Sequence, residues 1–259
     1  MKKIILLIIC LLFNVSQVLA WETPVLRKPM LTPIGDTSVQ DTIKKMPPGL
    51  TSYKDFSHSR SGDIGSLNAD FVFGSPIPTF TSTSGTFTIT GGGIQITTAN
   101  DEVLKYAILN NRTAAQETIV IKFTPTGDFA NDGVLRMLLM EDGFRREISK
   151  DYLTKEMRFW SNVADDISVY AEATTDVKSD ILYSVGCVCL NPNVQNIYLN
   201  GVLEGTNSNN WTLETLGTYF YIGCHPIGAN QLNGIIHSIA FFNRALSASE
   251  VATATNLMK

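Results

Sequence analysis

Residues 126–133, TGDFANDG, gather three side chains that could hold a metal ion. Asp128, Asn131 and Asp132 are close neighbours, and all three present oxygen donors. Ca²⁺ is a hard cation that takes carboxylate and amide oxygens as ligands. We expect these residues to be the ligands if the protein binds Ca²⁺, and the alternative is an ordinary polar turn.

Carboxylates placed to act together as a general acid and base are not evident. Glu141-Asp142 and Asp165-Asp166 are adjacent pairs, and adjacent residues on a strand point to opposite faces of the sheet. Both pairs are more typical of solvated turns. The sequence contains neither a Gly-x-Ser-x-Gly elbow nor a phosphate-binding glycine loop, and its three histidines are widely separated. We therefore expect a protein that is not an enzyme.

One tryptophan is placed to contact a sugar. Trp211 lies in the polar stretch TNSNNWTLET, where an aromatic ring is expected to be exposed beside hydrogen-bonding groups. It is our candidate ligand-binding residue. Trp160 and Tyr170 lie in strand-like segments, and we expect them to pack in the core.

Three cysteines in the second half of the chain are candidates for a disulfide: Cys187, Cys189 and Cys224. Cys187 and Cys189 are two residues apart, so on a strand they share a face. Only one of them can easily pair with Cys224. The equal alternative is that all three are small buried side chains. A zinc site would need a fourth ligand, for which His225 is the only neighbour.

The elements that must position these residues follow a segment with the features of a secretory signal. Lys2 and Lys3 precede an apolar run over residues 4–13, which is too short to span a bilayer, and residues 18–20 offer a cleavage site. We expect residues 1–20 to be removed, with no integral membrane segment left. The product would be secreted, periplasmic or held at a cell surface, where a disulfide can persist.

The composition excludes some classes of partner. The chain carries a formal net charge of −4, and its basic residues are not clustered. This pattern argues against nucleic acid as a ligand.

The rest of the chain divides into an arm and a strand-rich domain. Residues 21–65 contain five prolines and many polar residues, which favours a Pro-rich extended arm or linker. Residues 66–259 contain short strand-like segments bounded by glycine or proline, as in an antiparallel sandwich or jelly roll. In ETIVIKFTP, residues Ile119, Ile121 and Phe123 point one way, whereas Val120 and Lys122 point the other.

The chain closes on a helix with strong local signals. Ser247 and Glu250 have the spacing of a capping box, and Leu246 and Val251 have that of a hydrophobic staple. A helix this short is not stable alone. We expect it to dock on the sheet.

The last third of the chain resembles a known domain family. NIYLNGVLEGT (196–206), TYFYIGC (218–224) and LNGIIHSIAFFNRALSASEVATA (232–254) occur in the order found in laminin-G-like, concanavalin A-like domains. The resemblance implies an all-β, two-sheet antiparallel jelly roll with a short C-terminal helix, and often a Ca²⁺ ion at its rim. Asn200-Gly201 supports it independently, because this dipeptide favours a tight hairpin turn.

The resemblance implies an exported, non-enzymatic binding module that recognises a glycan or a cell-surface protein. One alternative is a structural or adhesive component of a cell surface or virus particle, in which the domain could form an oligomer. Another is a glycoside-cleaving enzyme. That enzyme would need two carboxyl groups about 5–10 Å apart in one cleft.

Overall fold

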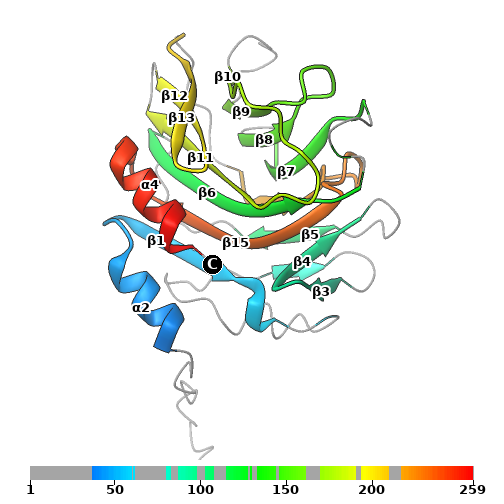
Figure 1. Ribbon diagram of the computed structural model, residues 1–259, viewed down its shortest axis with the longest axis horizontal. Helices are drawn as coiled ribbons and strands as arrows, with labels where there is room; N and C mark the ends of the chain where they lie inside the picture. The colour runs from blue at the N-terminus through cyan, green and yellow to red at the C-terminus, as the bar shows by residue number, and fades with distance from the viewer. Residues whose placement is uncertain are drawn as a thin grey trace, which may run out of the picture. The chain divides into compact units, whose positions relative to one another are not determined.

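The computed structural model describes residues 37–59, 61, 80–82, 87–97, 103–107, 115–127, 129, 133–143, 146–161, 170–190, 194–209 and 217–258. Most of these residues form two antiparallel β-sheets that pack face to face, with two α-helices beside them (Figure 1). The predicted signal segment, residues 1–20, lies outside the described part of the chain.

The first sheet contains eight of the described strands. Seven follow one another in the order β13 (Val202–Asn207), β12 (Val194–Leu199), β11 (Tyr183–Leu190), β6 (Gln116–Pro125), β15 (Gly234–Phe242), β4 (Gly93–Ile96) and β3 (Thr88–Thr90). The eighth, β1 (Leu50–Asp55), shares one edge of β15 with β4. Strand β4 pairs with the first half of β15 and β1 pairs with the second half.

The second sheet contains seven of the described strands. Their order is β10 (Tyr170–Glu172), β9 (Met157–Ser161), β8 (Arg146–Lys150), β7 (Arg136–Glu141), β14 (Tyr219–Ile222), β5 (Leu104–Ala107) and β2 (Phe80–Ser82). All the pairings between these strands are antiparallel. The predicted fold class, a two-sheet antiparallel jelly-roll sandwich with a short C-terminal helix, is confirmed.

The main core lies between the two sheets. Ile119, Ile121 and Phe123 of β6 are buried there, as the alternation of the sequence predicts. Phe220 of the seven-stranded sheet stacks on Phe241 of the eight-stranded sheet, with ring centroids 5.1 Å apart. Such aromatic pairs bury large apolar areas, which makes them strong contributors to sandwich stability.

A second apolar cluster lies on the outer face of the eight-stranded sheet. Here α4 (Ala248–Leu257) covers β6 and β11, and Val251 and Ala254 pack with Val120. The predicted capping box is present: the Ser247 side chain accepts from the N–H of Glu250, and the Glu250 carboxylate accepts from the N–H of Ser247. Because this face of the helix is buried, α4 is held by tertiary packing as well as by its cap.

Part of the segment expected to be an extended arm is regular structure: the structure describes residues 37–59 and 61 of it, and most of these are helix or strand. Residues Thr37–Lys45 form helix α2, Leu50–Asp55 form β1, and the 3₁₀ turn η1 (Phe56–His58) follows. Pro47 and Pro48 lie between α2 and β1, where a proline ends an element without disrupting one. Val39 and Ile43 of α2 and Tyr53 of β1 belong to the same apolar cluster as α4.

The predicted tight turn joins β12 to β13. Asn200 and Gly201 have φ angles of 51° and 80°, and the turn between these antiparallel strands requires such positive values. Neither helix in the described part of the chain is long and apolar enough to cross a membrane.

Candidate functional site

One row of side chains crosses the outer face of the seven-stranded sheet, which is the face turned away from the core. Each member is the direct partner of the next across neighbouring antiparallel strands, and partners in such a ladder share a face. We call this set the cross-strand row. It runs through Lys105 on β5, Tyr221 on β14, Met140 on β7, Glu147 on β8, Trp160 on β9 and Tyr170 on β10.

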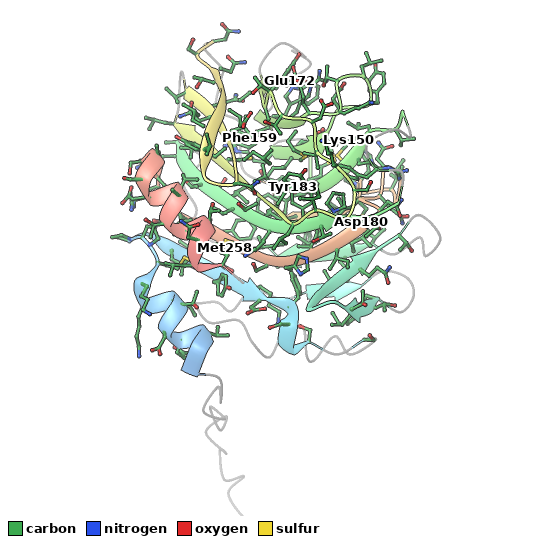
Figure 2. All side chains as sticks on the ribbon, in the orientation of Figure 1. Lys150, Phe159, Glu172, Asp180, Tyr183 and Met258 are labelled. Atoms are coloured by element: carbon green, nitrogen blue, oxygen red, sulfur yellow. The ribbon has the colours of Figure 1, made fainter. Side chains whose placement is uncertain are left out.

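Strand alternation places these side chains outward. On β9, Met157 and Phe159 are buried in the core, so Arg158 and Trp160 face the other way. On β14, Phe220 and Ile222 are in the core, and Tyr219 and Tyr221 therefore share the outer face. In Figure 2, Phe159 lies between the sheets, whereas Glu172 lies on the side away from the eight-stranded sheet.

Aromatic rings and cations meet at both ends of the row. Trp160 and Tyr170 have ring centroids 6.1 Å apart, and the Arg158 guanidinium lies 4.6 Å from the centroid of Tyr170. At the other end, the Lys105 ammonium lies 5.4 Å from the centroid of Tyr221 and 5.8 Å from that of Tyr219. These cation–π contacts hold the rings in fixed orientations.

Arg158 organises the polar groups beside the row. Its Nε donates to Glu172 Oε1 at 2.7 Å, and its second arm forms an ion pair with Asp151. Asp151 also accepts from the backbone N–H groups of Leu153 and Thr154, at 2.7 and 2.9 Å. Burial acts to raise the pKa of Asp151, but these hydrogen bonds and Arg158 together lower it. The result is a preorganised group of charged side chains.

Glu147 has a different environment on the same face. It is only 8% exposed and accepts a 2.6 Å hydrogen bond from the hydroxyl of Ser149. Burial raises its pKa, and this effect outweighs the opposing influence of Ser149 and of the Arg158 charge. Glu147 is therefore a carboxyl group that keeps its proton to higher pH than an exposed one.

The residues predicted to bind ligand and metal fall outside the described part of the chain. This applies to Trp211 and to Asp128, Asn131 and Asp132. Within the described residues, no group of three His, Cys, Asp or Glu side chains is placed to hold a metal ion. Both assignments stay predictions.

The expectation for Trp160 and Tyr170 is wrong. Both are half-buried, and neither belongs to the core between the sheets. The alternation in the segment MRFW could have shown this for Trp160, because Phe159 and Trp160 are adjacent and only one of them can face the core. Arg158 was also missed, since its partners Asp151 and Glu172 come from other segments.

The carboxylate pair Glu141-Asp142 is only partly the solvated turn that its sequence suggests. Glu141 ends β7, has no exposed surface, and accepts from the N–H of Gly217 at 2.6 Å. Asp142 accepts from the N–H groups of Thr218 and Tyr219. Both carboxylates therefore tie β7 to the segment that leads into β14. Asp165-Asp166 lies outside the described residues.

No disulfide joins the three cysteines. Cys187 and Cys189 are buried in the core on β11, whereas Cys224 belongs to a small apolar cluster with Met137, Met140 and Tyr221. Because Tyr221 and Met140 lie on the outer face of the seven-stranded sheet, that sheet separates the two groups of thiols. Burial also raises the pKa of the Cys187 thiol well above its usual value, which makes it unreactive.

Comparison with known proteins supports the same class of fold. A family model described as "Concanavalin A-like lectin/glucanases superfamily" matches residues 141–252, which confirms the resemblance seen in the sequence. Among curated proteins, no sequence matches the chain.

Solved structures with similar folds share little sequence with this chain. The Trypanosoma rangeli sialidase in complex with sialic acid is 16% identical with a TM-score of 0.58, and the match covers 82% of this chain and 33% of that one. A mutant of HCR D/C VPI 5995 is 10% identical with a TM-score of 0.57, and the match covers 71% of this chain and 48% of that one.

These similarities bear on the fold alone. The chain spans about a third of the length of the sialidase structures it matches. The part of the chain that matches the family model, residues 141–252, lies within a two-sheet sandwich whose strands begin before residue 141.

Proposed function

We propose that the protein is an exported, non-enzymatic module that binds a glycan on the outer face of its seven-stranded sheet. The observation that carries the proposal is the cross-strand row. Its pairing brings Trp160 and Tyr170 onto one face together with charged and hydrogen-bonding side chains, whereas Tyr221 and Met140 in the middle of the row are buried.

The aromatic rings suit the apolar faces of sugar rings. Trp160 and Tyr170 are half-buried, and Tyr219 is exposed. An aromatic ring offers a large, rigid contact area with little loss of conformational entropy on binding. The Arg158 guanidinium lies over the ring of Tyr170, and the Lys105 ammonium lies over that of Tyr219, so two of these rings contact a cation before a ligand arrives.

The polar groups suit sugar hydroxyls. Arg158, Glu172 and Thr154 form a connected set, since Thr154 Oγ1 donates to Glu172 at 3.0 Å. Carboxylates accept hydrogen bonds from hydroxyl groups, and a guanidinium donates to hydroxyl oxygens. Because Arg158 is already paired with both Glu172 and Asp151, which leaves this group with one net negative charge, this end of the face favours a neutral glycan over an acidic one.

Glycoside cleavage is a second candidate, because Glu147 and Glu172 share this face in different environments. Glu147 has a raised pKa, as a general acid requires, and Glu172 is ion-paired. Two strand spacings of about 4.8 Å and a two-residue offset of about 6.7 Å separate the two residues by about 12 Å at the backbone. Carboxyl groups in such enzymes lie about 5–10 Å apart. Arg158, on the strand between them, holds the Glu172 carboxylate in an ion pair, which makes it less available as a base or nucleophile, and this favours binding over catalysis.

The test is binding of the full chain to a broad glycan panel, compared among wild type, Trp160→Ala and Trp211→Ala. We expect a neutral glycan to bind the wild type and to bind Trp160→Ala at least about tenfold more weakly, given about 1.5 kcal/mol for a lost aromatic contact. Loss on Trp211→Ala with Trp160→Ala unchanged would move the site to the loop around Trp211. If no glycan on the panel binds, and light scattering shows a discrete oligomer, the results would instead favour a structural or adhesive component of a cell surface or virus particle.

The same samples decide between binding and cleavage. Each bound glycan is incubated with wild type, Glu147→Gln and Glu172→Gln, and the products are separated by chromatography. We expect intact glycan in all three samples. Release of shorter products by the wild type, abolished in both variants, would establish the enzyme instead.

A further inference from the structure

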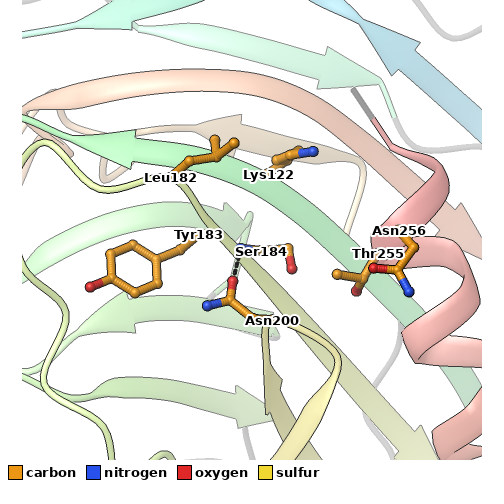
Figure 3. A pocket seen from close by; sticks show the side chains of 7 residues that line it. All are labelled: Lys122, Leu182, Tyr183, Ser184, Asn200, Thr255 and Asn256. Atoms are coloured by element: carbon orange, nitrogen blue, oxygen red, sulfur yellow. Dashed lines mark hydrogen bonds between the residues drawn. The ribbon is translucent and has the colours of Figure 1, made fainter.

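A pocket of about 250 Å³ lies on the outer face of the eight-stranded sheet, beside the last turn of α4 (Figure 3). It is on the other sheet from the cross-strand row. Its lining comes from β6, β11, the residue before β11, the β12–β13 turn and α4, in the form of Lys122, Leu182, Tyr183, Ser184, Asn200, Thr255 and Asn256. Drug-sized ligands occupy pockets of about 300 Å³ or more, so this one suits a smaller molecule.

Two hydroxyl groups in the pocket lack hydrogen-bond partners. Ser184 is 3% exposed and Thr255 is 8% exposed, and neither Ser184 Oγ nor Thr255 Oγ1 has a partner in the described part of the chain. A buried polar group without a partner costs about 1–3 kcal/mol. Both residues line the same pocket, so one ligand could satisfy both hydroxyls.

An ammonium group stands beside these hydroxyls. Lys122 is the direct partner of Ser184 across β6 and β11. Its Nζ donates to the carbonyl of Met258 at 2.7 Å, which fixes the ammonium at the end of α4. An ammonium has three N–H donors, so this hydrogen bond leaves two of them for a ligand.

The lining favours a ligand that accepts hydrogen bonds and carries negative charge. The described residues that line the pocket include one cation and no carboxylate, and the Asp55 carboxylate acts on Lys122 from β1, across Ser238 of β15. Asn200 is held in place because its Oδ1 accepts from the N–H of Ser184 at 2.9 Å. Leu182, half exposed, supplies an apolar wall, whereas the ring of Tyr183 faces the core beside Phe123.

We propose that this pocket binds a small organic anion, whose oxyanion contacts the Lys122 ammonium and the hydroxyls of Ser184 and Thr255. The organic part of the ligand lies against Leu182. A carboxylate and a phosphate share this chemistry, and the pocket size limits the ligand to about one sugar ring.

The experiment is calorimetric titration of the full chain with three matched probes: glucuronate, glucose 6-phosphate and glucose. We expect one or both anions to bind and glucose to give no heat of binding. The stronger of the two anions tells whether a carboxylate or a phosphate is preferred. Glucose binding as tightly as glucuronate would overturn the assignment of an anion, and silence from all three probes would overturn the site.

Variants then locate the binding. Lys122→Met should weaken the anion at least about tenfold, because a charged hydrogen bond contributes about 1.5–3 kcal/mol. The matched control is Lys44→Met on α2, where Lys44 is an exposed lysine outside the pocket; it should leave affinity unchanged. If Lys122→Met fails to fold, Thr255→Val and Ser184→Ala decide, since each removes only a hydroxyl that has no described partner.

Two results would place the anion elsewhere. One is full affinity in both hydroxyl variants. The other is loss of affinity on Trp160→Ala, which would put the anion on the cross-strand row. Unchanged anion binding in Trp160→Ala, with weakened binding in Thr255→Val, supports two independent sites.

Discussion

The packing of α4 against β11 makes a quantitative prediction about Gly186. A Cβ atom built at Gly186 would lie 2.8 Å from Val251 Cγ1 on α4, and 3.5 Å from the Cβ of Tyr198. Carbon atoms in favourable contact are about 3.5–4.0 Å apart. Gly186→Ala must therefore move Val251 Cγ1 away by about 0.7 Å, either by shifting α4 or by rotating the Val251 side chain. Helix α4 also carries Thr255, which lines the pocket.

The expected magnitude follows from two opposing effects. Overpacking of this kind costs about 1–3 kcal/mol. Replacing glycine within a strand recovers about 0.5–1 kcal/mol of backbone entropy. We expect Gly186→Ala to lower the free energy of unfolding by about 1–2 kcal/mol. Val251 is fully buried, so Val251→Ala should cost about 2 kcal/mol through two lost methyl groups and the space they leave.

The double variant tests whether the contact is the cause. Removing Val251 Cγ1 makes room for the new methyl group, so the double variant should be about as stable as Val251→Ala alone, which corresponds to a coupling of about 1–2 kcal/mol. Urea denaturation of the four proteins gives this coupling, provided that the m-value is unchanged. Additive losses would refute the reasoning, because they would show that Gly186 is needed for a reason other than the approach of α4.

Three further predictions concern charged groups. Glu147 has its pKa raised by burial, so the folded state binds more protons than the unfolded state above the ordinary pKa of 4.5. The free energy of unfolding should thus fall as pH rises from about 4.5 through the raised pKa of Glu147. Glu147→Gln should flatten the pH–stability profile over that interval. Glu250 has its pKa lowered to about 2 by Arg244 and the Ser247 N-cap. Its contribution is present above pH 4.5 and should be lost as pH falls toward 2, by about 1 kcal/mol for a surface cap and ion pair; Glu250→Gln should remove this acid-side slope. If residues 126–133 hold Ca²⁺, EDTA should lower the melting temperature of the wild type and leave that of Asp128→Asn/Asp132→Asn unchanged, and an equal melting temperature with and without EDTA in the wild type would exclude the site.

The sequence correctly predicted those structural features that depend on a few neighbouring residues. The capping box of Ser247 and Glu250 and the Asn200-Gly201 turn are both present as expected. The alternation in β6 correctly separated Ile121 from Val120. These features depend on a few adjacent residues, and the pleat of a strand or the φ angles of a turn then leave little choice.

The N-terminal part of the sandwich shows where such reasoning fails. The prolines around residue 47 indicated an irregular arm, yet β1 completes one edge of β15 and α2 shares the apolar cluster of α4. Strand β1 forms because β4 covers only half of that edge. The unpaired half of the β15 edge exists only once the sheet has assembled, so the local sequence around residues 50–55 does not reveal it.

Both candidate sites were decided by the tertiary structure. Lys105 and Tyr221 are direct partners although most of the domain separates them in sequence, and Glu147 joins the same row, beyond Met140, only through the strand order. Likewise, Lys122, Ser184 and Thr255 meet because α4 docks beside β11. The sequence by itself determined the class of fold and its turns, since those follow from local periodicity. The pairing of distant strands decided which side chains act together, because only the register of the sheets and the docking of the helix bring them onto one surface.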